Sequence, residues 1–246
     1  MKRSFILLIL CLTSFSTLAS DPIKLVTGPD YSPFTDEKLE RGGWAAALVV
    51  DAFAAVGYDV SLDWKPWKRG YMESMNAKFI GTFPYIPTVE RKKGFLYSDP
   101  FYTEEYVALS NLKETESYQK YDDMIGHTIC RPIGYAIPYR FEVLQKEGKI
   151  SLFQPKNMSD CTDKVMKQPK HIVILNRKQA KAQFQSNPEL IHQVQSHSLS
   201  EKGFTLHFIV SKQHPDAEKW IQRFNQGLKQ LRKDGQIKKL DNKFGL

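Results

Sequence analysis

Apolar and polar positions follow two different rhythms along the first third of the chain. In some short stretches they alternate strictly, which predicts strands with one buried face. In longer stretches apolar residues recur every three or four positions, which predicts amphipathic helices. We expect strands at residues 23–27, 58–64 and 79–83, and helices at residues 45–56 and 67–75. This strand–helix–strand order predicts a mostly parallel sheet with helices on its faces.

The same order begins again after a polar break at residues 113–123. Two such α/β units predict two lobes, and ligands of such sheets bind beyond the carboxyl ends of the strands. A last strand at residues 205–210 leads into an amphipathic helix at residues 215–232. Within the second unit we expect strands at residues 127–130, 150–153 and 171–175, and helices at residues 135–147 and 161–166.

The first nineteen residues have the features of a secretory signal peptide. A basic start is followed by the apolar core 5–12 and by a smaller, more polar end, with cleavage expected after Ala19. A membrane anchor is the alternative, but a spanning helix needs roughly 20 apolar residues, and this core is shorter. We therefore expect a soluble protein outside the cytoplasm.

The charge of the chain is positive and evenly spread. Its formal net charge is +8, which becomes +6 when Lys2 and Arg3 leave with the signal peptide. Nucleic-acid binding would need basic residues gathered on one face or in one motif. The densest basic run, residues 229–243, alternates with apolar residues at helical spacing and is predicted to be the outer face of terminal helices. No nucleic-acid partner is expected.

Two of the three cysteines lie in the mature chain, at Cys130 and Cys161. An even pair of cysteines in an exported chain predicts a disulfide. A metal site is the alternative, but no further histidine or cysteine lies at ligand spacing nearby. The sequence therefore predicts a disulfide and no metal or cofactor.

Three segments together resemble a known family. They are residues 88–93 (TVERKK) with 97–102 (YSDPFY), residues 30–34 (DYSPF), and the C-terminal stretch 228–245. The set resembles the periplasmic solute-binding proteins of amino-acid type, family 3 of the bacterial extracellular binding proteins.

The resemblance implies a fold and a function. The fold would be a two-lobed α/β fold of the type II periplasmic-binding-protein kind, in which each lobe is a mostly parallel sheet flanked by helices and two hinge strands join the lobes. Lobe 1 would comprise residues 20–108 plus 204–246, and lobe 2 residues 109–203. Such a protein works in the periplasm as a monomer and delivers an amino acid or related carboxylate to an ABC permease in the inner membrane.

The resemblance also implies a ligand site. Arg91 matches the family arginine whose planar, always charged guanidinium donates two hydrogen bonds to a ligand carboxylate. Tyr31 and Trp67 match aromatic positions that enclose the ligand. In the second lobe, Tyr135 is expected to open a helix whose free N–H groups face an anion, with Arg131 just before it as a second positive charge. The alternatives are a surface arginine for Arg91 and core packing for the aromatic residues.

Two departures from the family pattern bear on the ligand. The segment before Arg91 contains Phe83 and Tyr85 where amino-acid binders have small hydroxyl residues. Asn176 stands where an aspartate receives the ligand's ammonium group, and a neutral amide lacks the charge to favour that group. The hypothesis is a carboxylate with a flat or apolar body rather than a standard α-amino acid.

Two other classes of function share this fold. A sensory or partner-binding module would use the same cleft, and sequence alone does not separate it from transport. An enzyme would need reactive groups, but the chain has no nucleophile elbow, phosphate loop, zinc-ligand pair or Cys–His pairing. We therefore expect binding rather than catalysis.

Overall fold

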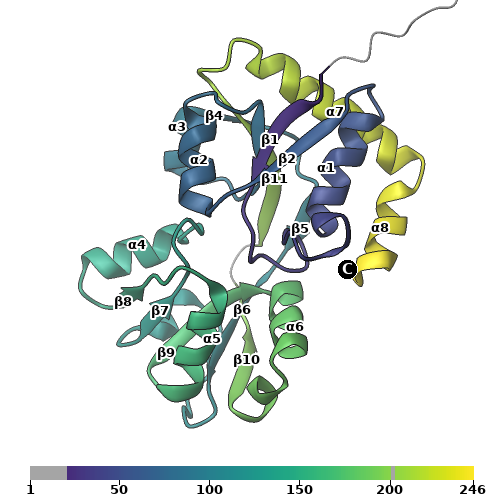
Figure 1. Cartoon of the computed structure of the whole chain (residues 1–246). Helices are drawn as coiled ribbons and strands as arrows, with labels where there is room; N and C mark the ends of the chain where they lie inside the picture. Colours follow the sequence, from purple (N-terminus) through teal and green to yellow (C-terminus); the bar gives the residue numbers. More distant parts are fainter. Residues whose placement is uncertain (1–20, 201–202) are drawn as a thin grey trace, which may run out of the picture.

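Two β-sheets, each flanked by helices, form two lobes that lie one above the other in Figure 1. The structure is a computed structural model that describes residues 21–200 and 203–246. The expected signal peptide, residues 1–19, lies outside the described residues. None of the described helices is long and apolar enough to cross a membrane.

The sheet of the first lobe has a parallel core with antiparallel strands beside it. Strands β2, β1 and β3 are parallel, while β11 runs antiparallel between β3 and β4 and also pairs with β5. The strands are β1 (Ile23–Thr27), β2 (Val60–Trp64), β3 (Gly81–Tyr85), β4 (Phe95–Tyr97), β5 (Tyr102–Glu104) and β11 (Phe204–Ser211).

Helices cover both faces of this first sheet. In β11, Phe208 and Val210 face the large core that includes α1 and α7, whereas Ile209 faces the opposite side with residues of α2. Helices α1 and α7 approach each other closely at Gly227. A side chain would not fit there, because its Cβ atom would lie 1.8 Å from the Ala52 carbonyl oxygen. The helical segments are the 3₁₀ turn Glu40–Gly42, α1 (Trp44–Ala54), α2 (Trp67–Met75), α3 (Val89–Gly94), α7 (Ala217–Lys233) and α8 (Gln236–Phe244).

The second sheet is likewise buried on both faces. In its central strand β9, Ile172 and Ile174 contribute to one apolar cluster, and Val173 and Leu175 to the other. Its order is β10-β6-β9-β7-β8, with β9, β7 and β8 parallel. The elements are β6 (Tyr106–Asn111), β7 (Thr128–Cys130), β8 (Ser151–Phe153), β9 (His171–Asn176), β10 (Val194–Ser198), α4 (Tyr139–Lys146), α5 (Met158–Lys167), α6 (Arg177–Ser186) and the 3₁₀ turns Tyr121–Met124 and Pro188–His192.

The expected start of the helix at Gly134–Tyr135 is wrong. Helix α4 begins at Tyr139, with Pro138 as its N-cap. A proline disfavours the helical conformation in the residue before it, so the helix cannot extend backwards through Ile137. Tyr135 therefore lies in a loop, and Gly134 in that loop has a positive φ of 90°. The anion site expected at a helix N-terminus there does not exist.

The chain passes between the two sheets twice. It leaves the first sheet after β5, continues directly into β6, and returns from β10 to β11. The lobes are thus joined by two connections, as the resemblance implied. The expected lobe boundary at residue 109 falls inside β6, which begins at Tyr106.

The predicted disulfide is present in the second lobe. Cys130 at the end of β7 is bonded to Cys161 in α5, 31 residues later. Both cysteines are fully buried. The bond ties the last residue of β7 to the helix that covers that face of the sheet.

Candidate functional site

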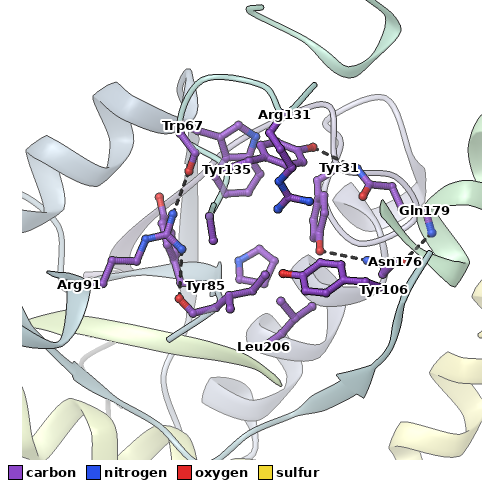
Figure 2. Close-up of a pocket in the computed structure, with 14 residues that line it drawn as sticks. Tyr31, Trp67, Tyr85, Arg91, Tyr106, Arg131, Tyr135, Asn176, Gln179 and Leu206 are labelled. Carbon is purple, nitrogen blue, oxygen red and sulfur yellow. Dashed lines mark hydrogen bonds between the residues drawn. The ribbon is translucent and has the colours of Figure 1, made fainter. Parts of the chain in front are cut away.

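A small pocket lies between the two lobes, lined by residues from both (Figure 2). Its volume of about 30 Å³ leaves room for very few water molecules. The lining residues are Tyr31, Trp67, Pro84, Tyr85, Ile86, Arg91, Tyr106, Arg131, Gly134, Tyr135, Ala136, Asn176, Gln179 and Leu206.

Three aromatic rings form one wall of the pocket. Tyr31 and Trp67 come from the first lobe and meet edge to face, with ring centroids 6.0 Å apart. Tyr135 comes from the second lobe and makes the same kind of contact with Tyr31 at 5.5 Å and with Trp67 at 6.1 Å. The indole N–H of Trp67 donates to the carbonyl of Pro29, which fixes the ring. The wall therefore closes only when the lobes are together.

Arg91 reaches the pocket from α3 in the first lobe. The helix is capped by Thr88, whose side chain accepts the backbone N–H of Arg91. The half-buried guanidinium donates to the carbonyl of Ile86 at 3.1 Å and, across the lobes, to that of Gly134 at 2.9 Å. It also lies over the ring of Tyr85, 4.8 Å from the centroid. The side chain is thus held at the boundary between the lobes.

Arg131 enters the pocket from the second lobe, directly after β7. It is only 3% exposed. One terminal nitrogen donates to the carbonyl of Ile174 at 2.8 Å, while its Nε has no hydrogen-bond partner. The guanidinium lies 5.6 Å from the ring centroid of Tyr106 and 5.5 Å from that of Tyr135. Figure 2 shows the guanidinium pointing into the space between the labelled side chains.

Asn176 ends β9 and caps α6, so its side chain has two partners. Its carbonyl oxygen accepts the backbone N–H of Gln179 at 2.7 Å, and its amide donates to the hydroxyl of Tyr31 at 3.1 Å. The amide of Gln179 donates to the hydroxyl of Tyr135 at 3.2 Å. The bond between Asn176 and Tyr31 links the two lobes, and the bond between Gln179 and Tyr135 lies within the second lobe; all of these groups are neutral.

Seven of the eight residues predicted for the site line the pocket, and Phe83 does not. Phe83 is fully buried in the core of the first lobe. A β-bulge explains the difference. Thr82 and Tyr85, three positions apart in β3, pair with Ile209 and His207, which are only two positions apart in β11. The bulge breaks the alternation that would place Phe83 and Tyr85 on the same face.

Sequence reasoning missed several lining residues. Tyr106 begins β6, Gln179 lies in the first turn of α6, and Leu206 is in β11. None belongs to the segments that carry the family resemblance. Only the pairing of the hinge strands and the packing of α6 bring these residues to the pocket, and no local pattern signals that.

The pocket contains two positive charges, on Arg91 and Arg131, and its other lining residues are neutral. Among the described residues that line it, none is acidic. The nearby carboxylate of Asp30 accepts the backbone N–H of Met158 at 2.6 Å, at the start of α5. Burial raises the pKa of Asp30, and the bond from Met158 opposes that shift. Burial also raises the pKa of Tyr85 to about 12 and that of Tyr135 well above its ordinary value.

A second cluster of polar side chains lies away from the pocket. Glu114, Glu116 and His127 each place a possible metal-ligand atom within 4.8 Å of the others. The Nε2 atom of His127 is 2.9 Å from the hydroxyl of Tyr118, so a hydrogen bond already uses it. We assign no metal to this cluster.

Comparisons with known proteins cover nearly the whole chain. The family model of the bacterial extracellular solute-binding proteins, family 3, matches residues 23–246. The arginine-binding extracellular protein ArtP of Bacillus subtilis (strain 168) is 23% identical over 240 residues, which are 95% of this chain and 91% of ArtP.

Solved structures share the fold. An ancestral arginine-binding protein bound to arginine superposes with a TM-score of 0.79 at 18% identity, over 92% of this chain and 99% of that one. A mutant of ArgBP from T. maritima superposes with a TM-score of 0.75 at 20% identity, over 90% of this chain and 94% of that one. The predicted two-lobed fold is confirmed.

Proposed function

The chain belongs to family 3 of the bacterial extracellular solute-binding proteins, and from this membership we propose that it captures a small carboxylate-bearing ligand between its lobes. In this proposal the protein works in the periplasm, as a monomer, after cleavage behind Ala19. It then delivers the ligand to an ABC permease in the inner membrane. An amino acid or a related carboxylate is the ligand class that the name of the arginine-binding relative supports.

The observation that carries the proposal is the pocket itself. Its cationic and aromatic side chains come from both lobes, and Arg91 already spans them through its bond to Gly134. A ligand carboxylate can replace the carbonyl groups of Ile86 and Gly134 as the acceptor of Arg91. It would then accept two charge-assisted hydrogen bonds from this one guanidinium. Closure of two lobes around a ligand is a common binding motion.

The lining residues favour binding over catalysis. The described residues that line the pocket include no aspartate, glutamate, histidine, cysteine, serine or lysine. The remaining proton donors are tyrosines, and burial raises the pKa of Tyr85 and Tyr135 further from neutrality. General acid–base catalysis works best with a group whose pKa lies near the working pH.

A thermal-shift screen of the refolded mature protein tests the proposal. The panel contains amino acids, dicarboxylates, aromatic acids, polyamines and sugars. A carboxylate at 100 times its dissociation constant is expected to add about 2.7 kcal/mol to the free energy of unfolding. Arg91→Gln is expected to abolish the shift, whereas Arg223→Gln, which changes an exposed guanidinium on α7, keeps it. Binding only of a sugar or a polyamine, or an unchanged shift in Arg91→Gln, would contradict the proposal.

A further inference from the structure

We propose that the pocket selects a small dianion that carries no ammonium group, with one anionic end on Arg91 and the other on Arg131. A dicarboxylate is the simplest such compound. The inference rests on the proposed function, because it concerns the same pocket. It goes further because it names Arg131 as a second charged subsite and states that the ligand carries no ammonium group.

Arg131 is the first reason. Its guanidinium is always charged and almost completely buried, yet no carboxylate of the described residues forms an ion pair with it. The carbonyl of Ile174 accepts from its NH1 atom, the phenol of Tyr106 is hydrogen-bonded to its side chain, and its buried Nε donor has no partner. A buried charge needs a partner of opposite sign to offset its desolvation. The pocket-facing donors of Arg131 therefore form a built subsite for an anion.

The position of Arg91 is the second reason. The two guanidiniums enter the pocket from opposite lobes, as Figure 2 shows. Both charges act on the phenol of Tyr106: burial raises its pKa, and the charges of Arg131 and Arg91 oppose that rise, as does a hydrogen bond with Arg131. A ligand with an anionic group at each end gives each arginine its own partner and links the lobes when they close.

The lack of a counter-charge for an ammonium group is the third reason. Asn176 is neutral, and both ends of its side chain are bonded within the protein. The carboxylate of Asp30 is bonded to the backbone of Met158 and is not among the lining residues. An ammonium group would add a positive charge beside the buried guanidinium of Arg131 and the half-buried one of Arg91, which is unfavourable in a site of low dielectric.

Calorimetric titration of the wild-type protein with matched compounds tests the inference directly. Succinate, glutarate and adipate are compared with butyrate, which lacks the second carboxylate, and with L-aspartate and L-glutamate, which add an ammonium group. At least one dicarboxylate is expected to bind about tenfold or more tightly than every matched compound. Tighter binding of an amino acid, or equal binding of butyrate, overturns the inference but leaves the proposed function standing. If no carboxylate or amino acid binds, both fail.

Two variants locate the effect. Arg131→Gln is expected to weaken dicarboxylate binding by about a hundredfold, since it removes one partner of a buried charge pair. Asn176→Asp keeps the oxygen that caps α6 and is expected to reverse the preference, so that L-aspartate or L-glutamate binds more tightly than the dicarboxylate. Arg223→Gln is the matched control. Dicarboxylate affinity within threefold of wild type in Arg131→Gln, with the fold verified by circular dichroism, contradicts the assignment, as does an unchanged preference in Asn176→Asp.

Discussion

At the scale of single residues, Tyr85 shows how the pocket holds polar groups in a neutral form. Its phenol is buried in β3 beneath the guanidinium of Arg91. Burial raises its pKa to about 12, while the neighbouring positive charge acts in the opposite direction. The ring thus offers Arg91 a neutral aromatic face, and such a contact is worth about 0.5–2 kcal/mol.

The raised pKa predicts an alkaline loss of stability. In the unfolded chain the phenol ionises near pH 10, whereas in the folded protein it ionises near 12. The stabilisation is complete below pH 10 and is lost as the pH rises towards 12, by about 2–3 kcal/mol. Urea unfolding at pH 9 and 11.5 measures this loss, which Tyr85→Phe is expected to reduce. Tyr139→Phe, at a residue that is 72% exposed, is the control. Equal losses in Tyr85→Phe and wild type would contradict the assignment.

The sequence predicts a site residue when a short segment around it carries a recognisable pattern. Arg91 and Tyr31 lie in segments that resemble the family, Trp67 matches one of the family's aromatic positions, and all three line the pocket. Phe83 does not, because a bulge formed through pairing with β11 places Phe83 and Tyr85 on opposite faces of the sheet. Bulges depend on the partner strand, so the alternation within residues 79–83 cannot reveal one.

At the scale of elements, the disulfide holds the part of the second lobe that presents Arg131. Cys130 is the residue before Arg131, and its partner Cys161 lies in α5. The first turn of the same helix, at Met158, receives the carboxylate of Asp30 from the other lobe. One covalent bond therefore fixes both the cationic subsite and a contact between the lobes.

Removal of this disulfide is expected to cost stability. The chain-entropy model gives about 3–4 kcal/mol for a loop of 31 residues. The double variant Cys130→Ser with Cys161→Ser should lower the free energy of unfolding by that amount in urea titrations. Wild type with and without reducing agent provides an independent comparison. A change below about 1 kcal/mol in both experiments would show that the bond does not constrain the unfolded chain.

The elements themselves were predicted best where the period was clear. The helix from Ala45 onwards and the last long helix appear as α1 and α7. Strand β6 carries no alternating pattern that would predict it, because all six of its residues are buried. The apolar pattern alone predicts a start of α4 that is too early, because Pro138 disfavours the helical conformation in the residue before it.

At the scale of the whole molecule, direct contacts hold the two lobes together around the pocket. The hydroxyl of Tyr135 donates to the carbonyl of Asp30 at 2.7 Å, beside the bond between Asp30 and Met158. Gly134 faces Trp67 so closely that a Cβ atom there would lie 2.6 Å from the Cβ of the tryptophan. The closeness of the lobes therefore requires a glycine at this position.

Gly134→Ala is expected to keep the lobes apart and weaken ligand binding by about tenfold or more, or about 1.4 kcal/mol. Gly126→Ala is the matched control, because Gly126 has a similar φ of 86° but no atom within 4 Å of an added Cβ. Both variants carry the backbone strain of a side chain at positive φ. Calorimetry with the ligand found in the screen, and X-ray scattering for the radius of gyration, compare the two. Equal affinities would exclude a role of Gly134 in closure.

The position of β11 has a consequence for the order in which the protein folds. The strand lies inside the first sheet, between β3 and β4, but it is made after the whole second sheet. A chain that emerges from its N-terminus onwards can therefore complete the second lobe while the first still lacks an inner strand. Until β11 arrives, one edge of β3 has no partner, and unpaired edges promote aggregation. The first lobe begins first and finishes last, so the edge of β3 stays exposed for as long as the second lobe is being synthesised and folded.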